Sequence, residues 1–539
     1  MKNVMTFTFK ISVVALMAIT STTAFTSAQS KSSFSDSLPG LTSSKLKDRS
    51  AAVDLLLRSK DKRLRNIINS LLNNQLFYRK SDNLIAFIKK EEKRAFALAV
   101  LSNKKYNDIA LREWKKIIIN NRLRTKLRSA LAIIDLNNFS PTVRSGAIRQ
   151  VLKQIDVSQL PELSKRLISE KDEEIKDLLE LTISTLRLKD GDGDRLELIE
   201  KIRGSIHPSV RQVLLGTFQN EDDPESKVAA QKALQAIDRK LDRYNKIETL
   251  FFGLSLGSVL VLAAIGLAIT FGVMGVINMA HGELIMLGAY ATYVVQICFP
   301  TLIEYSVIIA IPVAFIISSL AGILIERGVI RFLYGRPLET LLATFGISLI
   351  LQQLVRSIFG PLNRAVKTPS WMSGVWQINE ALAVTWNRLY IILFSLLVFA
   401  LLFLILKKTR LGLMIRAVSQ NRSMARAMGI KANWVDAMTF GLGSGIAGIA
   451  GVALSQLTNV GSNLGQAYII DSFMVVVFGG VGNLWGTLVS GFGLGITNKL
   501  LEPWSGAVLA KIIVLLFIIV FIQKRPRGLF PQKGRATES

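Results

Sequence analysis

Three polar residues interrupt a long apolar stretch near the middle of the chain. Between Leu250 and Phe299 nearly all other residues are hydrophobic or small, but Asn278, His281 and Glu283 fall within a few positions of one another. An ionisable side chain that faces lipid costs roughly 2.5 kcal/mol or more. We therefore expect a broken helix, either at a pathway where these groups exchange hydrogen bonds with a polar solute or at a contact between subunits.

Glycines surround these residues and recur in a second segment. The first segment covers 272–288, and the second covers 471–495, where Asp471 and Asn483 are the polar candidates. Short interrupted spans at matching places indicate a substrate route near the midplane of the membrane. Close helix packing also uses glycine, but it does not explain the charged side chains. The predicted helix-break glycines are Gly272, Gly275, Gly282, Gly479, Gly480 and Gly482.

The composition indicates a membrane protein with an unlike, soluble part. Half of the 539 residues are hydrophobic, the mean hydropathy is +0.37 and the net charge is +27, which excludes an ordinary soluble nucleic-acid binder. Most charged residues lie in the first half, and most apolar runs lie in the second. The predicted parts are a signal peptide over 1–28, an extracytoplasmic α-helical domain over 29–247, a transmembrane domain over 248–531 and a cytoplasmic tail over 532–539.

The first 28 residues have the pattern of a secretory signal. Two lysines flank the start of an apolar run over 11–19, and small residues end at Ala28, so we expect cleavage before Gln29 and export of the residues that follow. A buried N-terminal helix is the alternative. Cys298 is the only cysteine, which excludes an intrachain disulfide despite the oxidising location.

The exported half is predicted to be helical throughout residues 38–244, because apolar residues recur there at three- and four-residue spacing. A turn followed by a helix also repeats, at first with a spacing of roughly 33 residues. This pattern predicts a HEAT-like array of helical pairs. The four turns lie at Ser140, Asp172, His207 and Asp223.

Two charged clusters in this half have plain explanations. The aspartates over 190–194 suggest a calcium loop, but Arg195 and Lys201 stand where an EF-hand needs glycine and glutamate, so we expect a turn. The basic cluster 60–65 is expected on a solvated face or against anionic headgroups, because export separates it from nucleic acid.

Six apolar runs are long enough to span a bilayer, and three shorter runs are broken by glycine. Basic residues concentrate over 327–336, 407–431 and 524–535, which are therefore predicted to be cytoplasmic. Counting crossings backwards places the residues before Leu250 outside, as the signal peptide does. The long runs are 250–272, 302–325, 338–357, 389–406, 432–454 and 507–523, and the short ones are 282–298, 469–482 and 484–499.

The residues around both breaks resemble a known family. GVINMAHGEL over 275–284 and MLGAY over 286–290 closely resemble the membrane permeases of ABC importers for branched-chain amino acids and urea. FGGVGN over 478–483 and GTLVSG over 486–491 are similar to the second glycine motif of that family, and the resemblance covers about 249 to 531. The MAHGE sequence and the large exported extension look most like the urea-transporting members, since members for amino acids generally lack the extension.

The resemblance implies an all-α, polytopic permease that works by alternating access beside a second permease subunit, cytoplasmic ATP-binding subunits and an extracytoplasmic substrate-binding protein. The exported domain would be a docking platform for that protein or an assembly scaffold. No G-x-x-x-x-G-K-[ST] phosphate loop occurs, so another subunit would hydrolyse ATP, and we expect no cofactor or metal.

The basic segment 407–431 contains a helix-compatible stretch, residues 416–429, which ends in glycine. Ordinary topogenic charge is one explanation. The resemblance offers another, because a cytoplasmic helix between spans docks on the ATPase in such importers. The glutamate of the commonest docking motif is absent. The candidate docking residues are Arg416, Ala417, Arg422, Ala425 and Gly429.

Urea is the solute first expected, and a branched-chain amino acid is the alternative. Urea is neutral and planar, and Glu283 or Asn278 can accept its N–H groups while Asn278 or His281 donates to its oxygen. A packing or intersubunit role for Glu283 is equally compatible with the sequence. A passive channel would not need the docking-like segment. A membrane enzyme is disfavoured, because the chain has two histidines and no paired carboxylates in its membrane half.

Overall fold

The described part of the chain is mostly α-helical, and six of its helices are long and apolar enough to cross a membrane. The predicted all-α, polytopic membrane fold is therefore confirmed. The predicted signal peptide, 1–28, and tail, 532–539, lie outside the described residues. The structure is a computed structural model that describes residues 34–531 except 60, 62, 92–93 and 108.

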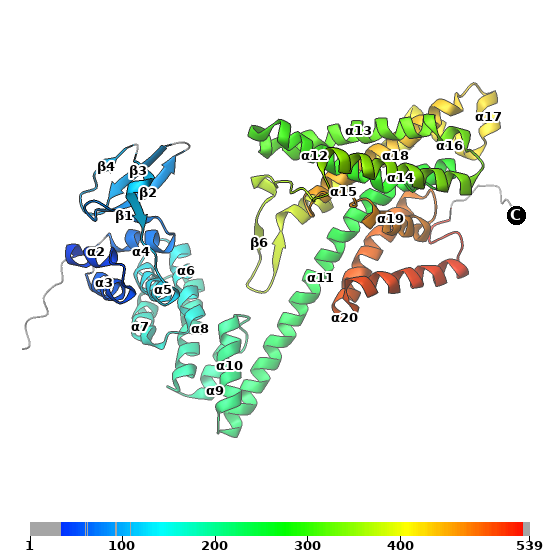
Figure 1. The fold of residues 1–539 in the computed structure, drawn as a ribbon. Helices are drawn as coiled ribbons and strands as arrows, with labels where there is room; N and C mark the ends of the chain where they lie inside the picture. The colour runs from blue at the N-terminus through cyan, green and yellow to red at the C-terminus, as the bar shows by residue number, and fades with distance from the viewer. Residues whose placement is uncertain (1–33, 60, 62, 92–93, 108, 532–539) are drawn as a thin grey trace, which may run out of the picture. The chain divides into compact units, whose positions relative to one another are not determined.

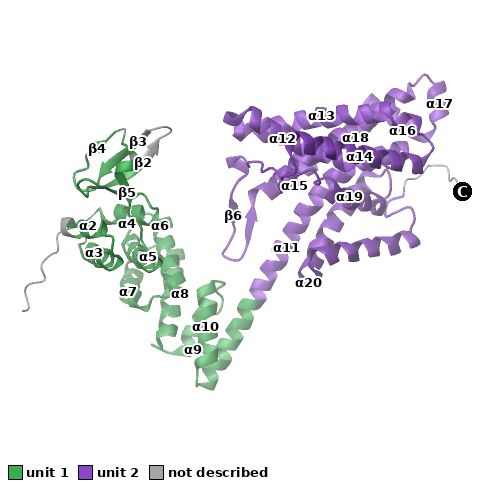
Figure 2. Ribbon diagram, viewed as in Figure 1, with its two compact units in different colours: residues 1–238 green, residues 239–539 purple. Residues whose placement is uncertain are grey.

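The chain divides into two compact units, residues 1–238 and 239–539 (Figure 2). The described part of the first unit begins with three short helices, and their apolar stripes form a common core. In the third helix, the buried stripe is Leu64, Ile67, Ile68 and Leu71. The helices are α2 (Phe34–Leu41), α3 (Leu46–Arg58) and α4 (Leu64–Leu72).

A five-stranded antiparallel sheet follows, so the prediction of helix throughout residues 38–244 is wrong for this segment. The strand order is β4-β3-β2-β1-β5 (Figure 1), with Leu76 of β1 opposite Phe87 of β2. Alanine and lysine are frequent here and favour helices in isolation, but cross-strand pairing over a buried face decides the structure. The elements are β1 (Leu76–Arg79), β2 (Ile85–Glu91), β3 (Arg94–Ala99), β4 (Lys105–Tyr106), the 3-10 helix η1 (Leu111–Glu113) and β5 (Trp114–Lys116).

Helices begin directly after all four predicted turns. Asp172 accepts hydrogen bonds from the first N–H groups of α8, and proline at the first position of α6 and α10 lacks the donor that a helix start cannot use. Gly191 ends α8 with φ 83° and Asp194 caps α9, so the acidic cluster forms a turn. The helices are α5 (Asn121–Asp135), α6 (Pro141–Gln154), α7 (Leu160–Ser169), α8 (Glu173–Asp190), α9 (Arg195–Ile202) and α10 (Pro208–Asn220), with η2 (Val157–Gln159) before α7.

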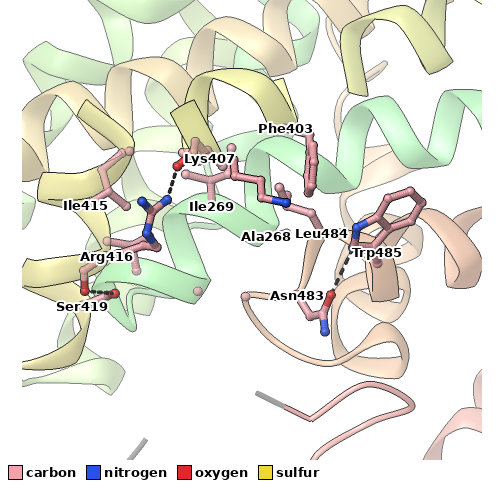
Figure 3. Close-up of a pocket in the computed structure, with 15 residues that line it drawn as sticks. Ala268, Ile269, Phe403, Lys407, Ile415, Arg416, Ser419, Asn483, Leu484 and Trp485 are labelled. Atoms are coloured by element: carbon pink, nitrogen blue, oxygen red, sulfur yellow. Dashed lines mark hydrogen bonds between the residues drawn. The ribbon is translucent and has the colours of Figure 1, made fainter. Parts of the chain in front are cut away.

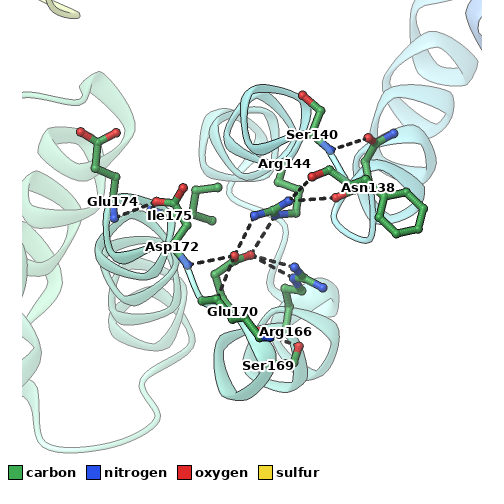
Figure 4. Close-up of polar contacts among 11 residues, drawn as sticks. Asn138, Ser140, Arg144, Arg166, Ser169, Glu170, Asp172, Glu174 and Ile175 are labelled. Carbon is green, nitrogen blue, oxygen red and sulfur yellow. Dashed lines mark hydrogen bonds and ion pairs between the residues drawn. The ribbon is translucent and has the colours of Figure 1, made fainter.

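A buried ion-pair network joins α6 to α7 (Figure 4). The Glu170 carboxylate accepts two hydrogen bonds from Arg144, at 2.8 and 2.9 Å, and two from Arg166, at 2.9 and 3.1 Å. Arg144 also donates to the Phe139 carbonyl at 2.9 Å. Burial raises the pKa of Glu170, but the hydrogen bonds from the two arginines outweigh it and lower the pKa to about 2.

Each of the six predicted spans of the second unit overlaps one helical segment of sufficient length and hydropathy, and the span 302–325 begins in η3 before α13. The shorter runs form α12, α19 and the first part of α20, which is interrupted at Gly506. The long helices are α11 (Pro224–Met274), α13 (Ser306–Gly328), α14 (Pro337–Phe359), α15 (Trp386–Lys408), α18 (Ala432–Ser455) and α20 (Leu484–Lys524). The shorter elements are α12 (His281–Cys298), η3 (Pro300–Tyr305), η4 (Ile330–Phe332), η5 (Ser370–Met372), β6 (Val375–Gln377), β7 (Ala383–Thr385), α16 (Arg410–Gln420), α17 (Arg422–Ala427) and α19 (Gln466–Gly479).

Small residues allow α12, α13 and α18 to pack closely at the core of the second unit. A Cβ built on Gly288 of α12 would clash with the Gly448 carbonyl oxygen of α18, and one on Gly322 of α13 would lie 2.5 Å from the Ser444 Cβ. Such contacts require glycine, as is usual between membrane helices. By contrast, α14 and α15 carry many large apolar side chains on exposed faces.

Candidate functional site

The first break separates α11 from α12 by six residues outside any helix. Gly275 turns the chain there with φ 66°, a conformation that favours glycine. The Asn278 side-chain oxygen accepts a hydrogen bond from the Ala280 N–H at 3.0 Å. The Nε2–H of His281 donates to the Ala263 carbonyl of α11 at 2.9 Å. Both predicted polar residues therefore fix the shape of the break.

Glu283 lies in the first turn of α12 and is only 1% exposed. Its Oε1 accepts hydrogen bonds from Gln352 at 2.7 Å and from Ser348 at 3.0 Å, both on α14. Its Oε2 has no hydrogen-bond partner among the described residues, and neither have Asn278 Nδ2 and His281 Nδ1. Because an unpaired buried polar atom is costly, three of them over 278–283 mark a candidate binding site.

A polar stripe on α14 contacts this break, although hydropathy alone does not reveal it. Four-residue spacing places its members on one face of the helix, and this spacing is visible in the sequence. All four members are buried, whereas Leu342 and Ile350 of the same helix are 71% and 66% exposed. The Thr344 hydroxyl accepts the Met279 N–H of the break at 3.1 Å. The polar stripe consists of Thr340, Thr344, Ser348 and Gln352.

The polar residues of the second break have partners of their own. Asp471 of α19 is 6% exposed, and its carboxylate accepts a hydrogen bond from Lys511 of α20 at 2.8 Å. Asn483 caps α20, because its side-chain oxygen accepts the N–H groups of Trp485 and Gly486 at 3.1 and 3.2 Å. Asn483 thus contacts its own segment and Asp471 contacts the later part of α20, and neither contacts the polar residues of the first break.

Glycines bring the backbone of the first break into contact with the second break and with Gly465, which precedes α19. A Cβ on Gly272 would lie 2.5 Å from the Gly482 Cα, and one on Gly282 would lie 2.6 Å from the Gly465 carbonyl oxygen. Close packing thus accounts for these glycines, while it leaves the unpaired polar atoms of the first break unexplained. Similar constraints apply at Gly479, which contacts Gly486, and at Gly480, which has φ 104°.

A cavity of about 390 Å³ opens beside this contact (Figure 3). Lys407, from the last turn of α15, lines this cavity, whereas Glu283 and Asp471 do not. In the described chain, no group of three or more His, Cys, Asp or Glu residues can hold a metal ion. Four sequence-predicted residues line the cavity, namely Gly272, Arg416, Gly482 and Asn483.

The predicted docking residues are partly turned inward. Ala425 is buried, and Arg422 forms an ion pair of 2.5 Å with the buried Asp436 of α18. Ala417 is half-buried, and Gly429 turns the chain after α17 with φ 85°. The exposed apolar residues of the same segment are instead Leu413, Met424 and Met428.

The region that contains both breaks matches a known protein family. The profile of the family described as the branched-chain amino acid transport system permease component matches residues 249–522. This match spans half of the chain and includes both breaks and the cavity. The chain belongs to this family. The permease is therefore a membrane component of a transport system, and its relatives are not enzymes.

The permease is similar to LivH of Salmonella typhimurium, which is described as the high-affinity branched-chain amino acid transport system permease protein. The two sequences are 29% identical over 293 residues, and this alignment covers 52% of this chain and 94% of LivH. It is 27% identical over 296 residues to BraD of Pseudomonas aeruginosa, covering 53% and 96%. It is 25% identical over 288 residues to the probable LivH of Methanocaldococcus jannaschii, covering 50% and 88%. No solved structure matches the permease.

Proposed function

We propose that this chain is the permease subunit of an ATP-driven ABC importer and that its solute is a branched-chain amino acid. The observation that carries the proposal is the family match over 249–522, which falls entirely within the second compact unit. The names of LivH and BraD state transport of branched-chain amino acids. Transport of the same class of solute by this chain is the simplest reading of that relationship.

The contacts of α14 support a zwitterionic solute. Arg356 continues the four-residue spacing of the polar stripe, and its guanidinium donates to Ser462 at 3.0 Å and Asn463 at 2.6 Å. These partners are neutral, and no ion pair of Arg356 occurs among the described residues. One end of this helix face therefore carries a cation, while Glu283 with its unpaired oxygen lies beside Gln352. An amino acid has the complementary pair of charges.

We place the solute route along the polar stripe and the first break. The unpaired Glu283 oxygen and the hydroxyls of Thr344 and Ser348 can accept hydrogen bonds from an ammonium group, while the Asn278 amide can donate to a carboxylate. Broken helices near the midplane supply substrate contacts in many transporters. Alternating access would then expose this face first to one side of the membrane and then to the other.

Urea is the second candidate solute, because the first unit distinguishes this chain from the relatives. The alignments account for 94% of LivH and 96% of BraD, which leaves no room in either for a counterpart of the first unit. A large exported extension is one of the two features by which the sequence resembles urea-transporting members. The unpaired acceptor on Glu283 and the donor on Asn278 would also serve a neutral amide.

The proposed assembly contains a second permease subunit, cytoplasmic ATP-binding subunits and an extracytoplasmic substrate-binding protein. The absence of a phosphate-loop motif from the sequence supports hydrolysis of ATP by other subunits. On α16, on α17 and directly after α17, the exposed Leu413, Met424 and Met428 provide an apolar surface for the ATP-binding subunits. The first unit would meet the substrate-binding protein or support assembly.

The proposed location is the bacterial inner membrane, with the first unit outside and the C-terminus in the cytoplasm. Basic residues follow α13 and α15 and end α20, and the positive-inside rule places such segments in the cytoplasm. The signal-like pattern over 1–28 supports the same orientation.

Uptake by a deletion strain tests the proposed solute. Cells that lack this chain should lose most of their high-affinity uptake of labelled leucine and regain it when the chain is restored, while uptake of labelled urea stays unchanged. Excess unlabelled isoleucine should compete with leucine in the restored cells. Loss of urea uptake with intact leucine uptake would instead establish the second candidate.

A further inference from the structure

The cavity beside the two breaks carries positive charge that its own walls do not neutralise. Lys407 and Arg416 line it, and no acidic residue does. The Lys407 ammonium lies 5.2 Å from the centre of the Phe403 ring, and the Arg416 guanidinium donates to the Leu406 carbonyl. No ion pair of either residue with a carboxylate is found in the described chain. The cavity is therefore suited to an anion.

Next to Lys407, the cavity wall is aromatic and apolar. Figure 3 shows Lys407 beside the Phe403 ring, with Arg416 on one side and Trp485 and Asn483 on the other. The Trp485 ring lies 5.8 Å from the Phe403 ring and 5.3 Å from the Phe399 ring, and Trp485 is 53% exposed. The positive end of the α20 dipole also lies at this wall.

These features match the level at which membrane helices meet lipid headgroups. Lys407 stands in the last turn of a 23-residue apolar helix, where a basic side chain reaches the interface, and tryptophan is enriched at the same level. Large apolar residues of α15 such as Leu401 and Leu404 are also exposed. A ligand here can place an anionic group on the cations and an acyl chain on the rings.

We propose that this cavity binds an anionic phospholipid, with the phosphate between Lys407 and Arg416 and an acyl chain along Phe403 and Trp485. Basic pockets between membrane helices bind such headgroups in this way. The apolar wall favours a lipid over free phosphate, because free phosphate would leave the exposed Trp485 ring uncovered. The proposal does not depend on which solute is transported.

Lipid binding by the purified full-length chain tests the proposal. The chain is placed in nanodiscs of phosphatidylcholine that contain a minor fraction of phosphatidylglycerol, and the bound phosphatidylglycerol is measured by native mass spectrometry. Lys407→Gln should lower its apparent affinity about fivefold, and Lys407→Gln with Arg416→Gln about 30-fold, at about 1 kcal/mol per cation. Lys408→Gln is the matched control, because Lys408 is the neighbouring exposed lysine and does not line the cavity.

The two variants test whether the lipid binds at this cavity, and competition with inorganic phosphate tests whether the ligand is a lipid. Lys407 forms a ring contact and no side-chain hydrogen bond in the described chain, so Lys407→Gln keeps the proposal testable even if the double variant folds poorly. Unchanged phosphatidylglycerol binding in Lys407→Gln, or an equal loss in Lys408→Gln, would overturn the site. Displacement of phosphatidylglycerol by millimolar inorganic phosphate at constant ionic strength would overturn the choice of a lipid, whereas retention supports it.

Discussion

Glu283 of α12 and Gln352 of α14 are joined by a hydrogen bond of 2.7 Å between the carboxylate and the side-chain amide. Ser348 donates to the same carboxylate oxygen, and the other oxygen has no partner in the described chain. The carboxylate is thus held in place by α14 but keeps one oxygen for another ligand. This relationship connects the first break to the polar stripe, and it is the basis of the proposed route.

Removing the charge of Glu283 should impair transport more than assembly. In Glu283→Gln the amide oxygen can still accept from Gln352, so the break keeps its shape, but the attraction for an ammonium group is lost. We expect leucine uptake to fall about tenfold or more, since a hydrogen bond to a charged group is worth about 1.5–3 kcal/mol.

Complex assembly should remain unchanged in Glu283→Gln when it is measured by co-purification of the subunits. Glu339→Gln is the matched control, because Glu339 is an exposed carboxylate at the start of α14. Full uptake in both variants would remove Glu283 from the route.

The charge of Arg356 should distinguish an amino acid from urea. Arg356→Gln removes the cation that lies one helical turn beyond the polar stripe. Uptake of a solute that carries a carboxylate should therefore fall more than uptake of urea. We expect a fall of about tenfold in leucine uptake, whereas Arg331→Gln, which alters an exposed arginine of η4, should stay close to wild type. Equal leucine uptake in the two variants would argue against a zwitterion on this face.

Gly272 should tolerate no side chain. A Cβ there would lie 2.5 Å from the Gly482 Cα, so Gly272→Ala must push α11 away from the second break and should destabilise the fold by about 1–3 kcal/mol. Gly346 of α14 has open space around it, and Gly346→Ala should be neutral or stabilise by up to about 1 kcal/mol. Thermal unfolding midpoints in detergent measure both, and a Gly272→Ala midpoint at or above that of Gly346→Ala would contradict the packing.

The Glu170 network should make the first unit sensitive to acid. Folding lowers the pKa of Glu170 from its ordinary 4.5 to about 2, so the unfolded chain binds more protons between these values. The contribution to stability, about 3 kcal/mol, is therefore present above about pH 5 and is lost as the pH falls through 2.

Hydrogen exchange of α6–α8 in the full-length protein checks this dependence. Glu170→Gln should weaken protection strongly at pH 7 and much less at pH 3, after correction for intrinsic exchange. Glu173→Gln, which alters an exposed carboxylate on α8, should have little effect at either pH. The same loss of protection at both pH values in Glu170→Gln would show that the carboxylate charge is not responsible.

Hydropathy and turn chemistry predict most of the fold, because they depend on residues close together in the sequence. The six spans and the helix starts after Ser140, Asp172 and His207 belong to this class. The sheet over 76–116 could not be predicted in this way. Its strands are rich in alanine and lysine, and only pairing such as that of Leu76 with Phe87 stabilises them.

The candidate site was predictable in part. Asn278, His281 and Glu283 stand out as polar residues in an apolar run, and the four-residue spacing of the polar stripe was also available in the sequence. The partner of Asp471 could not be predicted from the sequence, because Lys511 lies 40 residues further along the chain. Asn483 carries a recognisable signal of a helix cap, which its place in a glycine-rich motif obscured.

Cysteine accessibility along α14 distinguishes a solute route from a packed helix contact. In the Cys298→Ser background, Ser348→Cys should react with a membrane-impermeant thiol reagent in the assembled importer, and saturating leucine should slow the reaction. Ile350→Cys, on the exposed apolar face of the same helix, should stay unreactive because that face meets lipid. Reaction of Ile350→Cys alone, or no protection of Ser348→Cys by leucine, would contradict a route along the polar stripe.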